Sequence, residues 1–149
     1  MLKAKSFLAI DFGASNLKLA EFDVSEAGGL LLRQYGFKAL SQEAMQDTGR
    51  EAALLRALQE SLAERPFASK QANVCAPGFN TFSKFVKLPP VDTSKVTQII
   101  QYEAQQNVPF PLEEVVWDYQ ILCAAPSGEL EVLLVAIKKD VVEGLFRVV

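Results

Sequence analysis

Histidine is absent from the 149 residues, and cysteine, methionine and tryptophan are scarce, with two, two and one copies. Without histidine the chain cannot build a histidine-dependent catalytic triad, and most catalytic zinc centres are excluded as well. Cys75 and Cys123 lie in apolar stretches without Cys-x-x-Cys spacing. We therefore expect both cysteines to be free and buried, contributing neither a disulfide nor a metal site.

An excess of basic residues and long hydrophobic runs are also missing. The formal net charge is −3 at pH 7, whereas nucleic-acid-binding proteins are usually basic, so we expect no nucleic-acid partner. No apolar run reaches the ~20 residues of a membrane helix. The apolar stretch near the N-terminus ends at Asp11, too early for a signal peptide. These absences predict a cytoplasmic protein, and the 50% apolar content predicts a packed core.

The first half of the chain has the pattern of a small α/β unit. Apolar runs bounded by turn residues predict an antiparallel meander of three strands, over 6–10, 17–24 and 30–40. A helix follows, for which Thr48 and Glu51 fit a capping box. Its predicted apolar face holds leucines at positions 54, 55, 58 and 62, and Pro66 stops it. A strand over 71–76 is expected to lie parallel to the first strand.

The second half has a different order of elements. We predict an extended segment over 79–88, a helix that ends near Asn107, and two strands over 115–123 and 131–137. This order places a boundary near residue 78. The last residues, 141–149, form an apolar helical run without a polar tail. Because such a helix exposes apolar surface, we expect the chain to be the front part of a longer protein, and to self-associate through this helix.

A turn between the first two strands carries the candidate functional residues. Asp11 ends a strand, where its carboxylate could hold a hydrated magnesium ion. Gly13 lets the backbone approach an anion, and residues 14–16 offer successive backbone N–H groups. Lys18 begins the return strand and could point a cation at a phosphate. The alternative is an ordinary hairpin turn, because aspartate, glycine, serine and asparagine are common turn residues.

This turn resembles the first phosphate motif of the actin-like ATPases, and the rest of the chain narrows the resemblance. Three stretches look like the type IV pilus assembly protein PilM family, namely 85–89, 99–120 and 133–142. They contain a helix with Glu-Ala, a Pro-Phe-Pro turn, an Asp-Tyr strand and a strand that ends in two lysines. The resemblance runs from about residue 6 to the last residue.

The resemblance implies an actin-like, ribonuclease-H-like α/β (α+β) fold. Residues 1–78 would be subdomain 1A, residues 79–138 an inserted subdomain 1C placed as in the cell-division protein FtsA, and residues 139–149 the start of a helix returning to 1A. It also implies that the full-length protein binds ATP and Mg²⁺, with Asp11 holding the ion through water. The nucleotide-binding residues would be Asp11, Gly13, Ser15, Asn16 and Lys18. Most of the ATP site would lie outside this chain, so we expect no nucleotide to bind the chain alone.

The resemblance further implies a cytoplasmic scaffold at the inner membrane that binds the N-terminal tail of a PilN-like membrane protein between 1A and 1C. Phe79, Phe82 and Phe85 are candidates for that groove, and core packing is the alternative. No acidic residue is placed to activate water, so we favour a scaffold over an enzyme and make no catalytic assignment. Three other interpretations stay open: half of a sugar or acetate kinase, an FtsA-like filament protein, and a type II secretion cytoplasmic domain.

Overall fold

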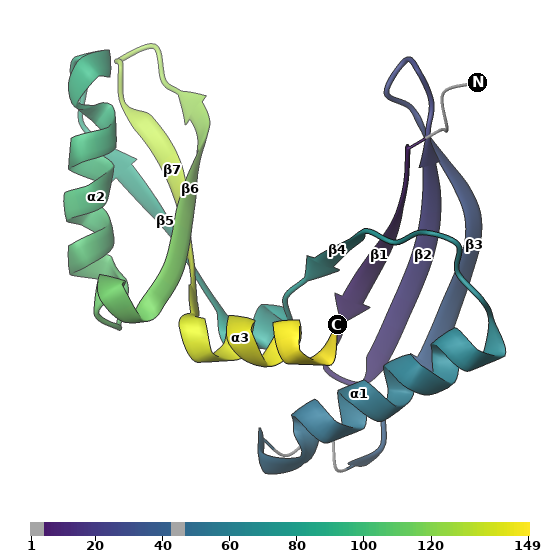
Figure 1. Ribbon diagram of the computed structural model, residues 1–149. Coiled ribbons are helices and arrows are strands. Elements are labelled where there is room, and N and C mark those ends of the chain that lie inside the picture. The colour runs from purple at the N-terminus through teal and green to yellow at the C-terminus, as the bar shows by residue number, and fades with distance from the viewer. Residues whose placement is uncertain (1–4, 43–46) are drawn as a thin grey trace. The chain divides into compact units, whose positions relative to one another are not determined.

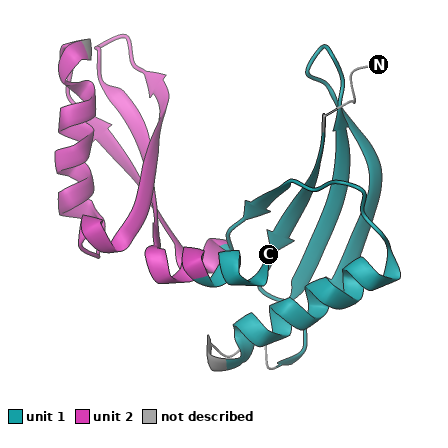
Figure 2. Ribbon diagram, viewed as in Figure 1, with its two compact units in different colours: residues 1–77, 144–149 teal, residues 78–143 magenta. Residues whose placement is uncertain are grey.

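The computed structural model describes residues 5–42 and 47–149 (Figure 1). They form two compact units, residues 1–77 with 144–149 and residues 78–143 (Figure 2). That these units are subdomains 1A and 1C stays a prediction. Within the described residues, no helix is both long and apolar enough to cross a membrane.

The first unit is a four-stranded sheet with a helix on one face. Its elements are β1 (Lys5–Phe12), β2 (Asn16–Val24), β3 (Leu30–Ala39), α1 (Asp47–Glu64) and β4 (Ala72–Cys75). The strand order is β3-β2-β1-β4, in which β1, β2 and β3 are antiparallel neighbours and β4 is parallel to β1. The predicted meander, helix and parallel strand are therefore confirmed.

The core of this unit lies between α1 and the sheet. Alternate residues of β1 and β2 face the helix, because side chains along a strand alternate between its two faces. The buried residues are Leu8, Ile10, Phe12, Leu17, Leu19, Leu54, Ala57, Leu58 and Val148. Of the four leucines assigned to the helix face, Leu55 and Leu62 are more than one-third exposed. Leu54 and Leu58 share their buried face with Ala57 and Ser61 instead, which follows the helical period more closely.

The predicted capping box at the start of α1 is wrong. The helix begins at Asp47, so Thr48 already lies inside it. The Glu51 carboxylate instead accepts two hydrogen bonds from Arg147, at 2.9 Å from Nε and 3.0 Å from Nη2. Arg147 belongs to α3 (Lys139–Val148), whose end packs on the core of the first unit through Leu145 and Val148. The apolar last helix is thus confirmed and partly covered, whereas Phe146 is 69% exposed.

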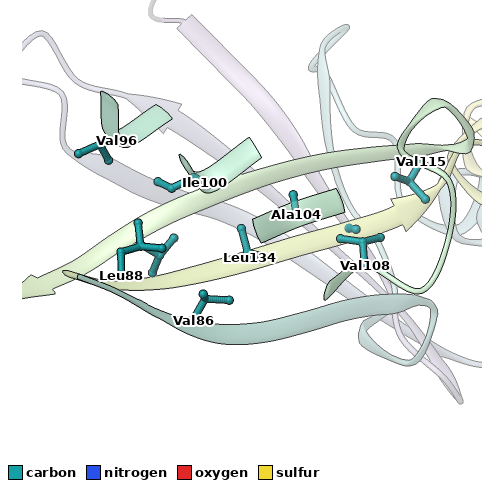
Figure 3. Packing of buried hydrophobic residues seen from close by; sticks show 10 residues of the cluster. Val86, Leu88, Val96, Ile100, Ala104, Val108, Val115 and Leu134 are labelled. Carbon is teal, nitrogen blue, oxygen red and sulfur yellow. The ribbon is translucent and has the colours of Figure 1, made fainter. Parts of the chain in front are cut away.

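The second unit is a three-stranded antiparallel sheet with one helix. Its main elements are β5 (Thr81–Leu88), α2 (Val96–Asn107), β6 (Val115–Ala124) and β7 (Leu130–Lys138), with strand order β5-β7-β6. Figure 3 shows side chains of α2 and of the strands meeting in one apolar core. Ile100 and Leu134, each 1% exposed, lie at its centre. This is the predicted strand–helix–strand–strand module.

Both cysteines are free, as predicted, but the prediction that they are buried is wrong, because both are exposed. Cys75 ends β4, which is an edge strand of its sheet, and Cys123 lies beside an irregularity in the pairing of β6 with β7. Edge positions leave a side chain with neighbours on one flank only. The apolar sequence around each cysteine therefore did not correspond to a packed environment.

Candidate functional site

The turn between β1 and β2 is anchored by the two residues that flank it. Phe12 and Leu17 are directly opposite each other in the strand register and are both fully buried. Gly13 follows Phe12 at a point where no side chain fits. A Cβ atom at this position would lie 2.9 Å from the backbone oxygen of Asn16, closer than real Cβ atoms approach. The glycine therefore allows the tight closure of this turn.

Asp11 and Lys18 are brought together on the side of the sheet opposite α1. They are opposite each other in the register, and Lys18 Nζ lies 2.7 Å from Asp11 Oδ2. Since the Lys18 and Asp11 side chains are 54% and 40% exposed, water screens the pair and the attraction between them is modest. A weak, exposed pair can separate at low cost when either charge gains a stronger partner.

The side chains of Ser15 and Asn16 are hydrogen-bonded to each other within the same turn. Asn16 Nδ2 donates to Ser15 Oγ at 2.9 Å, and the backbone N–H of Leu40 donates to the Ser15 carbonyl at 2.9 Å. The five residues predicted to bind nucleotide thus lie close together, and Leu40, which directly follows β3, contributes one backbone contact that supports the turn. Their binding role stays a prediction.

A pocket of about 280 Å³ lies beside the ion pair, and β4 supplies one of its walls. Its lining includes Asp11 and Lys18 together with Asn73 and Cys75. Cys75 is the direct neighbour of Asp11 in the parallel register. Sequence reasoning missed Asn73 and Cys75, although the predicted parallel pairing of the two strands pointed to them: the carboxyl ends of parallel strands lie at the same edge of a sheet.

Arg50 is a third residue that sequence reasoning missed. It is the fourth residue of α1, and its guanidinium reaches back to the turn. Nη2 donates to the Gly13 carbonyl at 2.8 Å and Nη1 donates to the Ala14 carbonyl at 3.2 Å. No local pattern could have identified this contact, because 37 positions separate Arg50 from Gly13.

A buried carboxylate, Glu21, holds the connection that places β4 beside β1. Glu21 is 2% exposed, and its Oε1 accepts hydrogen bonds from Ala68 N at 2.9 Å, Ser69 N at 2.7 Å and Ser69 Oγ at 2.6 Å. Its Oε2 accepts from Gln34 Nε2 at 2.9 Å. The hydrogen bond with the Ser69 side chain, supported by those from Gln34 and the backbone, lowers the pKa of Glu21, although burial acts in the opposite direction.

The metal-binding capacity of the site is limited to one carboxylate. Among the described residues, no three histidine, cysteine, aspartate or glutamate side chains are grouped as ligands of a metal ion. Mg²⁺ commonly keeps several waters and takes one or two carboxylates together with phosphate oxygens of a bound nucleotide. Asp11 therefore fits a magnesium ion that arrives with a nucleotide, and does not fit a resident metal centre.

The three phenylalanines proposed for a partner groove do not share one surface. Phe82 is partly buried and packs against the core of the second unit. Phe85 is 64% exposed, and it lies on the opposite face of β5 because three positions separate it from Phe82. Phe79, in the short helical turn before β5, is 55% exposed. Packing accounts for Phe82, while Phe79 and Phe85 present aromatic surface to solvent.

Comparison with known proteins adds independent information. A family model described as type IV pilus assembly protein PilM matches residues 9–149. A solved structure described as a PilM-PilN type IV pilus biogenesis complex is similar with a TM-score of 0.74 at 20% identity. The match covers 95% of this chain and 43% of that chain, so the present chain spans less than half of that relative.

Two further structures are similar over most of this chain. The cytoplasmic domain of EpsL, an inner membrane component of the type II secretion system of Vibrio cholerae, matches with a TM-score of 0.51 at 11% identity. This match covers 97% of the present chain and 52% of the EpsL domain. A Bacteroides thetaiotaomicron protein described as having an actin-like ATPase fold and unknown function has a TM-score of 0.42 at 13% identity, covering 99% and 52%. The element order confirms the predicted α/β (α+β) class, a unit of antiparallel meander, helix and parallel strand followed by a strand–helix–strand–strand module, and the first match shows that the PilM-PilN structure shares this fold.

Proposed function

Because this chain belongs to the type IV pilus assembly protein PilM family, we propose that the full-length protein is a cytoplasmic nucleotide-binding scaffold of a pilus assembly machine. The observation that carries the proposal is the family match over residues 9–149. Membership of this family disfavours the kinase interpretation. The proposed scaffold acts at the inner membrane, where it docks the N-terminal tail of a PilN-like membrane protein.

Nucleotide binding is supported by the arrangement of charges at the turn. Asp11 and Lys18 lie in contact, with 2.7 Å between Oδ2 and Nζ. The site therefore places a carboxylate that could hold a hydrated Mg²⁺ beside a cation that could bind a phosphate. In the proposed bound state, Lys18 leaves Asp11 for a phosphate oxygen and the carboxylate becomes available to the metal ion. Gly13 has no side chain, which would allow the backbone to approach the phosphates. Mg²⁺ would neutralise phosphate charge, while the protein residues bind and orient.

The two exposed cysteines provide an internal test of this site. Cys75 lines the pocket with Asp11 and Lys18, whereas Cys123 lies in the second unit and serves as the matched control. We expect saturating MgATP to slow alkylation of Cys75 by iodoacetamide in the full-length protein, and to leave Cys123 unchanged. Peptide mass spectrometry measures both rates in one sample. Equal alkylation of Cys75 with and without MgATP, together with no binding heat in calorimetry, would contradict nucleotide binding here.

Substitution of Lys18 gives a second measurement at the same site. In Lys18→Met the phosphate loses its cation, and we expect MgATP to bind at least about tenfold more weakly, which corresponds to about 1.4 kcal/mol. Lys84, an exposed lysine of the second unit, provides the control substitution Lys84→Met. Unchanged affinity in Lys18→Met would remove this lysine from the proposed phosphate contacts.

Partner docking is supported by the name of the similar structure, which pairs PilM with PilN, and by the exposed aromatic rings of the second unit. An extended peptide tail can add a strand to a sheet edge and place an apolar side chain against such rings. The strand β5 is an edge strand, and Phe85 lies on it with 64% exposure. We therefore propose that Phe85 and Phe79 contact the tail, while Phe82 supports the strand from the core side.

Calorimetry with a synthetic N-terminal tail of the membrane partner tests this docking. Phe85→Ser should weaken binding by about tenfold or more, because exposed aromatic anchors dominate such contacts. Tyr102→Ser is the matched control, since Tyr102 is 60% exposed on α2 in the same unit. Equal loss in both variants would indicate a general effect on folding, and no loss in Phe85→Ser would place the tail elsewhere.

A further inference from the structure

Arg50 binds two backbone carbonyls of the turn between β1 and β2, and these contacts fix the orientation of the turn's peptide groups. The guanidinium donates to two successive carbonyls, Gly13 at 2.8 Å and Ala14 at 3.2 Å. A guanidinium is a rigid planar fork, so two bonds of this kind constrain both the separation and the orientation of their acceptors. Arg50 itself is held on α1, which packs on the sheet through Leu54 and Leu58.

The orientation of these carbonyls determines where the neighbouring amides point. In a trans peptide unit the C=O of one residue and the N–H of the next lie in one plane and point in opposite directions. When Arg50 holds the carbonyls of Gly13 and Ala14 toward α1, the N–H groups of Ala14 and Ser15 are directed away from it. Both Ala14 and Ser15 are exposed. Successive N–H groups that point outward from a turn form a concave site for an anion.

We propose that Arg50 is a positioning residue, which orients the N–H groups of Ala14 and Ser15 toward a phosphate without contacting that phosphate itself. The proposal rests on the proposed function, in which the turn between β1 and β2 receives the terminal phosphates of a nucleotide. It adds a residue from α1 to a site that is otherwise built from two strands. Its role depends on two simultaneous hydrogen bonds and therefore requires arginine geometry in addition to positive charge.

Two substitutions separate geometry from charge. Arg50→Gln removes the charge and the fork, whereas Arg50→Lys keeps the charge and loses the fork. Arg65→Gln is the matched control, because Arg65 Nη1 also donates to a backbone carbonyl, that of Tyr35 at 3.0 Å, away from the turn. Calorimetry on the full-length protein should show MgATP affinity at least about tenfold weaker in both Arg50 variants and unchanged in Arg65→Gln. Wild-type affinity in Arg50→Lys with a loss in Arg50→Gln would overturn the proposal, because charge alone would then explain the effect.

A spectroscopic measurement without nucleotide keeps the two proposals distinguishable. Full-length protein carrying carbonyl-labelled glycine and alanine reports directly on Gly13 and Ala14, whose carbonyl shifts should change in Arg50→Lys and Arg50→Gln and stay fixed in Arg65→Gln. Failure of the wild-type protein to bind MgATP would refute the proposed function, and these shifts would still decide whether Arg50 orients the turn. Unchanged shifts in both Arg50 variants would refute the positioning role whatever the nucleotide affinity.

Discussion

Replacing Glu21 by glutamine should destabilise the first unit without affecting the second. The carboxylate is 2% exposed and accepts four hydrogen bonds. Glutamine keeps the shape of the side chain but has an amide nitrogen in place of one carboxylate oxygen. If its carbonyl oxygen keeps the three hydrogen bonds of Oε1, its amide nitrogen takes the place of Oε2 and faces Gln34 Nε2, so that two donors meet. Gln34 cannot simply turn over, because the same nitrogen donates to the Pro66 carbonyl at 3.1 Å. One hydrogen bond is therefore lost and the others lose their charge assistance.

The magnitude follows from these contacts. Hydrogen bonds to a charged group contribute about 1.5–3 kcal/mol each, and loss of the charge roughly halves that contribution. Part of this loss is offset, because neutral glutamine avoids the cost of burying a charge. We therefore expect Glu21→Gln to lower the free energy of unfolding by about 2–4 kcal/mol at neutral pH, a large part of the ~5–15 kcal/mol typical of a domain. The connection between α1 and β4 should open first, because Ala68 and Ser69 lose their common acceptor.

The effect should depend on pH with a defined sign. The pKa of Glu21 is lowered in the folded state. The ionised carboxylate therefore stabilises the folded protein at pH values above its ordinary pKa of 4.5, and this stabilisation is lost as the pH falls through the folded-state pKa. The difference in unfolding free energy between wild type and Glu21→Gln should be constant from neutral pH to about pH 5 and should shrink below 4.5.

Urea denaturation with two probes measures this prediction. The single tryptophan, Trp117, lies in the second unit and reports on that unit alone, whereas hydrogen exchange of β1 and β2 amides reports on the first. Glu21→Gln should move the exchange transition to lower urea and leave the fluorescence transition unchanged. Equal stability of the two proteins at neutral pH, or a difference that persists unchanged at low pH, would refute the reasoning.

Three further substitutions have defined outcomes. Gly13→Ala should lower the melting temperature and abolish MgATP protection of the pocket cysteine, because the added Cβ would lie 2.9 Å from the Asn16 oxygen; a melting temperature equal to wild type would show that the turn can relax. Ile100→Ala, at a position 1% exposed, should lower the free energy of unfolding of the second unit by about 2–5 kcal/mol. The tryptophan fluorescence transition should then move to lower urea, and amide hydrogen exchange in the first unit should stay unchanged. Reversal of one charge in the Glu51–Arg147 pair should increase amide hydrogen exchange at the end of α3, because the pair is bidentate. Reversal of both charges should return the exchange rate to that of wild type. No recovery in the double variant would mean that the pair does not hold this helix.

The order of elements was predictable because it depends on local patterns. The apolar runs and turn residues that predicted the first three strands are properties of neighbouring positions, and Pro66 stops the helix before it through its own geometry. The composition of the turn from Asp11 to Lys18 identified the candidate site for the same reason. Strand register then placed those two side chains opposite each other across a short hairpin.

Other features depended on residues far apart in the chain. Glu51 has a capping-box spacing, yet it binds Arg147, which lies 96 positions away and enters from another helix. The exposure of Cys75 depends on β4 being an edge strand, which no window of sequence around the cysteine reveals. Phe82 and Phe85 lie on opposite faces of one strand, and only the position of α2 decides which face is covered.

The nucleotide-site candidate combines both kinds of information. Local sequence identifies the acidic, glycine and lysine positions of the turn, because the tight closure and the cross-strand pair need those residue types at those spacings. The support behind the turn comes from Arg50, and one wall of its pocket comes from Asn73 and Cys75. These contacts exist only after α1 packs on the sheet and β4 aligns with β1, since a side chain acquires a distant neighbour only through the assembled core.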